Sequence, residues 1–146
     1  MVGVEIDFVV KDSLKALELY KTVFGVETIE ATSYAVGMNE VVFTLYGSRF
    51  HVLDENPEYH LLAPKEGEGK PMWLNILVEN IEETYNLAKE NGFADIQPLT
   101  KIPEMGITNA ILTDPFGYVW MLHQIHELVS FEDRIEYLEN VMEIEK

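Results

Sequence analysis

The sequence contains no cysteine and few basic residues. Of its 146 residues, 10 are lysine or arginine and 26 are aspartate or glutamate. The absence of cysteine excludes disulfides, thiolate catalysis and cysteine-ligated zinc. The formal net charge of −16 argues against nucleic acids and anionic membrane surfaces as partners, because both are recognised through basic patches. The same charge permits a cationic or metal-bearing ligand, although solubility alone also explains it.

Long apolar runs are missing as well. No stretch approaches the ~18 consecutive apolar residues of a membrane-spanning helix. The N-terminus does not resemble a targeting leader either, since residues 1–7 already alternate like a β-strand. We therefore expect a cytoplasmic protein without a membrane partner. Because 47% of the residues are apolar, the chain can bury the core of one domain or of two small halves.

The apolar pattern predicts the same order of elements twice, namely a strand, a helix and three strands. Three landmarks support this internal repeat. Val10-Lys11-Asp12 corresponds to Val78-Glu79-Asn80, Gly25 to Gly92, and the Gly47 turn to Pro115-Phe116-Gly117. The first half is expected to hold a helix at residues 13–24 and strands at 4–10, 27–33, 40–46 and 49–53. The second is expected to hold a helix from 81 to about 90 and strands at 71–78, 95–99, 108–113 and 118–124.

The repeat predicts an α+β fold in which two βαβββ modules form a curved, mostly antiparallel sheet cleft. We place the first module at 1–54, a linker or flap at 55–70, the second module at 71–126 and a C-terminal amphipathic helix at 127–146. The linker is rich in proline and glycine. In the last segment, apolar residues recur at helical spacing and Ser130 is a suitable N-cap. This helix either packs on its own domain, the more common outcome, or contacts a partner chain.

Several short motifs occur in order along the repeat. They are Val10-Lys11-Asp12 followed by residues 16–25, Met38-Asn39-Glu40, Gly47-Ser48-Arg49, Asp54-Glu55-Asn56-Pro57 and Asp114-Pro115-Phe116-Gly117. Over about residues 3–126 the chain resembles the vicinal oxygen chelate superfamily, most of all a bacterial glyoxalase-like branch. This superfamily includes glyoxalase I, bleomycin-resistance proteins, fosfomycin-resistance enzymes and extradiol dioxygenases. The resemblance implies a fold of paired βαβββ modules and often a homodimer that pairs modules across chains.

The resemblance also implies four metal-ligand positions, usually histidine, glutamine or glutamate. In this sequence they fall on Glu5, His51, Trp73 and Met121. Tryptophan cannot ligate a metal because its indole nitrogen is only a donor. A thioether is a poor ligand for Mg²⁺, Mn²⁺, Fe²⁺ or Zn²⁺. We therefore predict that the protein has no metal cofactor.

Strand alternation gathers polar and aromatic side chains on the sheet face that the helices do not cover. The candidate ligand-binding residues are Glu5, Asp7, Arg49, His51, Trp73, Asn75, Met121 and His123. Structural roles remain open for several of them. Glu5 and His51 can form an ion pair, which we favour over metal ligation. Trp73 can fill the core instead of stacking on a ligand, and Arg49 can pair with Asp7.

The predicted function is metal-free binding of a planar or cationic small molecule in a cleft between the two modules, as the likeness to bleomycin-resistance proteins implies. The alternative is a divalent-metal-dependent lyase, isomerase or dioxygenase with its metal at Glu5 and His51. A third hypothesis is a structural or regulatory role of the C-terminal helix. No catalytic residue is assigned.

Overall fold

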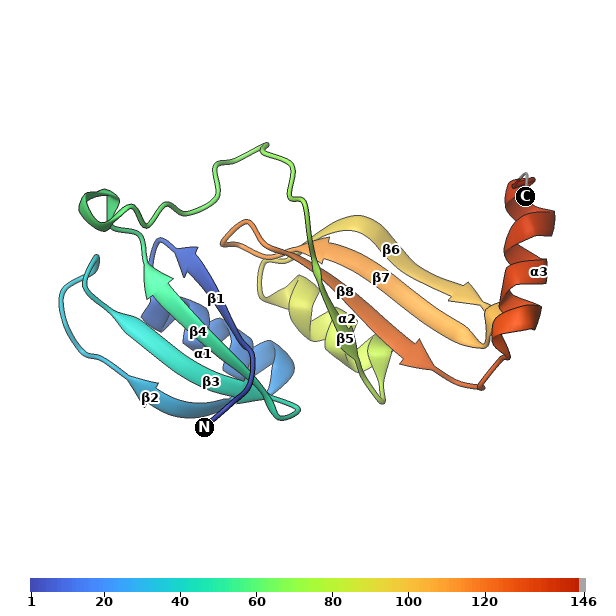
Figure 1. Ribbon diagram of the computed structural model, residues 1–146, viewed down its shortest axis with the longest axis horizontal. Coiled ribbons are helices and arrows are strands. Elements are labelled where there is room, and N and C mark those ends of the chain that lie inside the picture. The colour runs from blue at the N-terminus through green and yellow to red at the C-terminus, as the bar shows by residue number, and fades with distance from the viewer. Residues whose placement is uncertain (145–146) are drawn as a thin grey trace.

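A computed structural model describes residues 1–144 of the chain. Two four-stranded sheets lie side by side, and each carries one helix (Figure 1). The first module contains β1 (Glu5–Val10), α1 (Ser13–Phe24), β2 (Glu27–Ala31), β3 (Glu40–Leu45) and β4 (Ser48–Asp54). The second contains β5 (Leu74–Leu77), α2 (Ile81–Glu90), β6 (Ala94–Ile102), β7 (Ile107–Thr113) and β8 (Val119–Ile125). The prediction of an α+β fold with two βαβββ modules is confirmed.

The two sheets have the same topology. Their strand orders are β1-β4-β3-β2 and β5-β8-β7-β6, with the first strand of each module parallel to the last and the other pairs antiparallel. The register repeats too, since Ile6 pairs with Phe50 in one sheet and Leu74 with Trp120 in the other. These four side chains face the helices and contribute to the core. The internal repeat therefore extends to the pairing of individual residues.

The helices α1 and α2 have the N-caps that the sequence predicts, Asp12 and Asn80. The side chain of Asp12 accepts a hydrogen bond from the Lys15 amide, and that of Asn80 accepts one from the Glu83 amide. Gly25 ends α1 in the left-handed conformation, with φ of +68°, which glycine adopts without steric cost.

The last strand of each module supplies a second cap to the helix. In the first module, Asp54 Oδ1 accepts a hydrogen bond of 2.7 Å from the Ser13 amide. In the second, Gln124 Oε1 accepts one of 2.9 Å from the Ile81 amide. The repeat therefore includes a hydrogen bond from the helix N-terminus to the last strand. A carboxylate accepts it in the first module and a side-chain amide in the second.

An aromatic cluster joins the two modules. The Trp120 ring lies 5.4 Å from the Tyr20 ring and 4.7 Å from the Phe24 ring, between centroids. Asp114 accepts hydrogen bonds from the Tyr20 hydroxyl at 2.6 Å and from the Trp120 indole at 2.9 Å. Burial raises the pKa of Asp114, although these donors oppose the shift. The shared aromatic core fixes α1 of the first module against β8 of the second.

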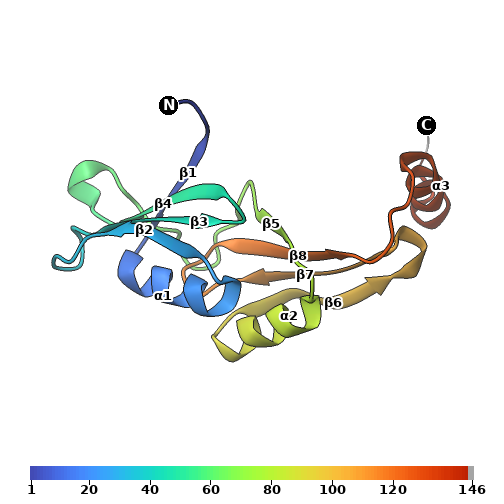
Figure 2. The same ribbon diagram turned by 90° about the horizontal axis from the view of Figure 1, so that it is seen from below.

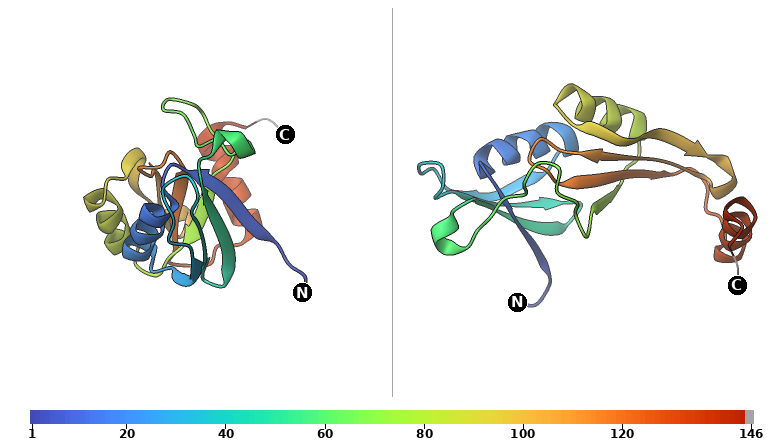
Figure 3. Two further views of the ribbon diagram at one scale, coloured as in Figure 1. Left: turned by 90° about the vertical axis from the view of Figure 1, so that its left-hand side faces the viewer. Right: turned by 90° about the horizontal axis from the view of Figure 1, so that it is seen from above.

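Both helices lie on the same side of the two sheets (Figure 2; Figure 3, right). The opposite side of each sheet is free of helices within residues 1–144, and we call these two surfaces the open faces. The segment between β4 and β5 runs past both modules and contains the short 3₁₀ turn η1 (Pro57–Tyr59). None of the described helices is long and apolar enough to cross a membrane.

Three sequence predictions need correction. β5 is shorter than predicted, at four residues. β6 is longer than predicted and runs through Pro98; it is an edge strand, and its register shifts between Gln97 and Thr100, where a proline is tolerated. The C-terminal helix α3 spans Phe131–Met142 rather than 127–146, and residues 145–146 lie outside the described part. Ser130 caps this helix as predicted.

The contact of α3 with its own domain is limited. No residue of α3 is buried, and Phe131 and Met142 are each 64% exposed. Its contacts with the second module run through the 3₁₀ turn η2 (Pro103–Met105). The helix projects from the end of that module (Figure 1). Helical spacing of apolar residues predicted the helix correctly but could not predict where it lies.

Candidate functional site

The eight predicted site residues divide between the two open faces. Glu5, Asp7, Arg49 and His51 come from β1 and β4 of the first sheet. Trp73, Asn75, Met121 and His123 come from β5, from the residue before it, and from β8 of the second sheet. Within each sheet the residues are neighbours by register, since Asp7 pairs with His51 and Asn75 with Met121. The structure thus brings the candidates together as two groups of four.

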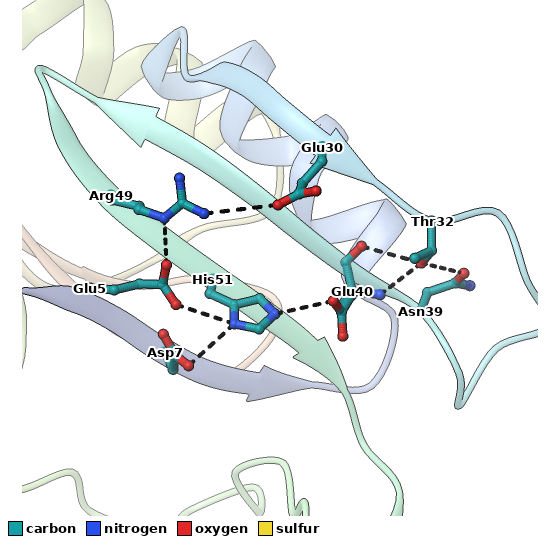
Figure 4. A network of polar contacts seen from close by, with 8 residues as sticks. All are labelled: Glu5, Asp7, Glu30, Thr32, Asn39, Glu40, Arg49 and His51. Atoms are coloured by element: carbon teal, nitrogen blue, oxygen red, sulfur yellow. Dashed lines mark hydrogen bonds and ion pairs between the residues drawn. The ribbon is translucent and has the colours of Figure 1, made fainter. Parts of the chain in front are cut away.

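The first group forms a charged cluster (Figure 4). His51 Nδ1 lies 3.3 Å from Glu5 Oε1 and 3.2 Å from Asp7 Oδ2. Arg49 Nε donates a hydrogen bond to Glu5 Oε2, and Arg49 Nη2 lies 3.8 Å from Glu30 Oε1. The expected contact between Glu5 and His51 is confirmed. The alternative that Arg49 pairs with Asp7 is wrong, because its guanidinium turns toward the glutamates.

The surroundings of Glu5 and Asp7 shift the pKa values of their carboxyl groups. The hydrogen bond from Arg49 lowers the pKa of Glu5, because it stabilises the carboxylate. Burial raises the pKa of Asp7, and the neighbouring Glu5 carboxyl raises it further. The pKa of Asp7 and the pKa of Glu5 are therefore shifted in opposite directions from their ordinary values. Such a pair beside an imidazole can hold a proton or attract a cation.

The open face of the second sheet is largely uncharged. Trp73 is 53% exposed and Leu77 is 56% exposed. His123 is the one titratable candidate on this face, and burial lowers its pKa, which favours the neutral imidazole. Its Nδ1 is buried without a hydrogen-bond partner among residues 1–144. Trp73 does not fill the core, since half of its surface faces solvent.

Two cavities lie beside Trp73, and it lines both. The larger, about 820 Å³, lies between the linker and the second sheet. It is lined by Lys11, 64–70, Trp73, Ile96, Ile111, 113–117 and Val119. The smaller, about 520 Å³, lies between the modules and is lined by Ile6, Leu45, Tyr46, Ser48, Phe50, 72–77 and Trp120. Of the four implied ligand positions, only Trp73 lines either cavity.

Sequence reasoning missed several residues of these cavities. Strand alternation could not find Lys11, Tyr46 or Met72, because they lie in turns or outside the strands. The available signal was the proline and glycine content of residues 64–70, which marked a flap but not the surface that it covers.

Comparison with known proteins identifies the family. The model of the Glyoxalase/Bleomycin resistance protein/Dioxygenase superfamily matches residues 4–122. The chain belongs to this superfamily. No sequence among the curated proteins matches the chain.

Solved structures of this superfamily's fold are similar to the chain at low sequence identity. FosX from Listeria monocytogenes, complexed with Mn(II) and sulfate, is 16% identical at a TM-score of 0.66, covering 94% of this chain and 98% of FosX. TioX from Micromonospora sp. ML1 is 16% identical at a TM-score of 0.61, covering 86% and 99%. A glyoxalase/bleomycin resistance protein/dioxygenase from Alicyclobacillus acidocaldarius is 18% identical at a TM-score of 0.60, covering 93% and 96%. At these identities the likeness shows the fold alone.

The four-ligand metal set of the superfamily does not fit this chain. Trp73 offers no acceptor atom, and Met121 offers only a thioether. In the first sheet, Glu5, Asp7 and His51 each provide a ligand atom, all within 4.8 Å of one another. The Arg49 guanidinium already occupies one oxygen of Glu5, which places a positive charge beside any cation bound there. The open face of the first sheet therefore offers a group of metal-binding atoms, whereas Trp73 and Met121, at the implied ligand positions of the second, do not offer suitable ones.

Proposed function

We propose that the protein binds a small molecule at the junction of its two modules without the metal centre of its superfamily. The observation that carries the proposal is Trp73. It stands at one of the implied ligand positions, cannot ligate, is half exposed, and lines both cavities. A partly exposed indole next to a concave surface is a typical platform for a planar ligand.

The chemistry around Trp73 supports a planar ligand most directly. Phe116, Ile111 and Val119 line the larger cavity, so its walls are apolar as well as charged. A cationic group on the ligand would be attracted by Glu5 and Asp7 on the open face of the first sheet. In a single chain these carboxylates do not line either cavity. Their contribution to ligand binding depends on how the open faces of two copies of the chain pack together.

We further propose a homodimer in which the first sheet of one copy covers the second sheet of the other. Both open faces lack a covering helix within residues 1–144, and they point the same way (Figure 2). Such a pairing would bring Glu5 and His51 of one copy toward Trp73 and Met121 of the other. Light scattering should then report twice the mass of the chain, and a single-chain mass at high protein concentration would exclude this pairing.

A ligand screen in the presence of EDTA tests the binding proposal. Thermal shifts are recorded against planar aromatic and cationic compounds, and hits are titrated by calorimetry. We expect hits that bind equally well with and without EDTA. Trp73→Ala should weaken them about tenfold, because aromatic stacking contributes ~0.5–1.5 kcal/mol beyond the buried area.

Tyr59→Ala is the matched control for Trp73→Ala. Tyr59 is also an exposed aromatic residue, at 63%, but lines neither cavity. Its variant should bind like the wild type. A screen without hits, together with metal-dependent turnover of a substrate, would refute metal-free binding.

The charged cluster supports a second candidate function, a divalent-metal-dependent lyase, isomerase or dioxygenase. Its basis is the short distance between ligand atoms of Glu5, Asp7 and His51. Elemental analysis of protein purified without chelator separates the two candidates. Near-stoichiometric Zn, Ni, Mn or Fe that disappears in His51→Ala would favour the enzyme, whereas a metal content far below one ion per chain favours the binder.

A further inference from the structure

Among residues 1–144, no charged side chain lines the smaller cavity. Its lining residues are Ile6, Leu45, Tyr46, Ser48, Phe50, 72–77 and Trp120. One quarter of the chain is charged, with a net charge of −16, so an uncharged surface of this size is unusual for the molecule. The larger cavity, by contrast, is lined by three lysines and by Glu66, Glu68 and Asp114. The two sides of Trp73 therefore differ in the ligand chemistry that they accommodate.

The smaller cavity has a buried floor and exposed apolar rims. Phe50, Ile76 and Trp120, at 5%, 6% and 0% exposure, belong to the core of the two modules. Met72 and Leu77 on the rim are 65% and 56% exposed. Exposed apolar side chains that are grouped around a hollow mark a binding surface, whereas scattered ones do not. Its volume of about 520 Å³ is within the range of small-molecule sites.

Tyr46 adds an independent observation on the same rim. It occupies the two-residue turn between β3 and β4, with φ of +50°, and is 74% exposed. This left-handed position favours asparagine or glycine, and a bulky aromatic residue there is strained. An exposed side chain gains little packing energy to offset that strain. Residues in such strained conformations cluster at functional sites, although His60 and Glu143 of this chain also have positive φ.

The polar groups of the cavity are few and neutral. They are the Tyr46 and Ser48 hydroxyls, the Asn75 amide and the Trp73 indole. These groups can donate or accept hydrogen bonds at the edge of a flat ligand. Within one chain, an ionised ligand would lose hydration there without gaining a counter-ion, which is costly.

We infer that the smaller cavity binds an uncharged planar molecule, stacked on Trp73 and Tyr46 and hydrogen-bonded at its edge by Asn75 and Ser48. This inference rests on the proposed function, since it names the ligand class of the same junction. The inference names a neutral ligand, whereas the amino-acid composition of the chain alone allowed a cationic one.

Three probes of one shape test the ligand class: 2-naphthamide, 2-naphthoate and 2-naphthylmethylammonium, titrated by calorimetry in EDTA. The neutral amide should bind at least about tenfold more tightly than either ion, because only the ions bury an unpaired charge. Its affinity should not change with salt concentration. If an ion binds as tightly as the amide or more tightly, and Trp73→Ala still weakens its binding, the inference of a neutral ligand is wrong. The proposed function would still stand. Absence of binding by all three probes would also overturn the inference, while hits elsewhere in the screen would preserve the function.

Two matched variants test the place of binding. Leu77 and Ile96 are exposed apolar strand residues of the second module, and Leu77 lines only the smaller cavity while Ile96 lines only the larger. Leu77→Asp should weaken the amide about tenfold and improve the relative affinity of the cation, because it introduces a negative charge. Ile96→Asp should leave both unchanged. If Ile96→Asp weakens binding and Leu77→Asp does not, the ligand binds in the larger cavity.

A second copy of the chain is the competing occupant of the smaller cavity. Three results together would show that the cavity is an interface between copies and that the inference is wrong. The wild type would be a dimer, Leu77→Asp would be a monomer by light scattering, and the amide would not bind. If the amide binds and the mass of Leu77→Asp equals that of the wild type, the cavity is a ligand site. Circular dichroism of each variant excludes loss of folding as the cause.

Discussion

The two modules share their backbone and differ in what they place on the open face. Where the first sheet pairs Asp7 with His51, the second pairs Asn75 with Met121. The helix-facing pairs Ile6–Phe50 and Leu74–Trp120, in contrast, are apolar. Packing against a helix thus constrains one face of the sheet, and the other face is free to change its chemistry. A repeated fold therefore does not carry a repeated site.

The modules also differ in how they are stabilised. Thirteen of the 21 buried apolar residues within residues 1–144 belong to the first module. The second module has fewer buried apolar residues, and one of them, Trp120, also contacts α1 through Tyr20 and Phe24. We expect the second module to be more sensitive to loss of a single core residue.

The largest predicted effect is that of Trp120→Ala, compared with Phe50→Ala at the equivalent position of the first module. Removal of a buried aromatic residue costs about 3–5 kcal/mol of unfolding free energy. Trp120→Ala should lie at the upper end, because it also removes the hydrogen bond to Asp114 and the contacts between modules. Denaturant unfolding measures both values, and Trp73→Ala, at an exposed site, should change stability by less than about 0.5 kcal/mol. A larger cost for Phe50→Ala would contradict the difference between the modules.

The second prediction concerns the two strand-to-helix caps. The Asp54 carboxylate accepts backbone hydrogen bonds from Ser13, Gly37 and Asn39. Burial opposes the charge, but these bonds outweigh it and lower the pKa of Asp54. Asp54→Asn should cost about 1.5–3 kcal/mol at neutral pH, the usual contribution of hydrogen bonds to a charged group.

The sign of the pH dependence follows from the lowered pKa of Asp54. Its stabilisation is fully present above the pKa of an unfolded aspartate, ~3.9, and is lost as pH falls through the folded value. The cost of Asp54→Asn should therefore shrink in acid. Gln124→Ala, which removes the neutral cap of the second module, should cost about 1 kcal/mol at every pH. Denaturant unfolding across this pH range tests both, and parallel profiles for the two variants would be inconsistent with a charged cap.

A smaller effect is expected where Tyr118 ties the modules together. Its hydroxyl donates to the Val9 carbonyl at 2.7 Å and accepts from the Val9 amide at 3.2 Å. Tyr118→Phe should cost about 1 kcal/mol and speed hydrogen exchange at the Val9 amide. Ser48, the equivalent residue of the first module, makes no such bond within the described part of the chain, so Ser48→Ala should change neither stability nor the exchange at Val9. Unchanged exchange at Val9 in Tyr118→Phe would show that other contacts hold the modules together.

The smallest effect is electrostatic and confined to the first open face. Arg49→Gln should raise the pKa of Glu5 toward its ordinary value, because the guanidinium that stabilises the carboxylate is removed. Stability should hardly change, since the pair is exposed to solvent. Carboxyl carbon chemical shifts, followed through a pH titration, measure the pKa. A Glu5 pKa that does not move would mean that Arg49 does not control the charge of this face.

The sequence predicts the elements of this fold better than their surroundings. The bounds of α1 and the caps at Asp12, Asn80 and Ser130 were predicted from local signals, because capping and periodicity depend on neighbouring residues. The predicted strand at 95–99 stopped three residues before the end of β6 at Ile102, because the register shift between Gln97 and Thr100 is a property of the sheet and not of the local pattern.

The candidate site was predictable only in part. Alternation of side chains assigned Glu5, His51 and Met121 to their faces, since parity along a strand is local. It could not show that Arg49 would prefer glutamate to Asp7, because both partners lie on other strands. Nor could it show the smaller cavity, which exists because β5 and the β3–β4 turn come from different modules that lie side by side.

The most direct test of metal-free binding at the junction is chemical-shift mapping of the 2-naphthamide complex in EDTA. Perturbed backbone amides are predicted around Tyr46, Trp73 and Leu77, with the same pattern when divalent metal is added. Perturbations restricted to the surroundings of Glu5 and His51, and seen only with metal present, would contradict it.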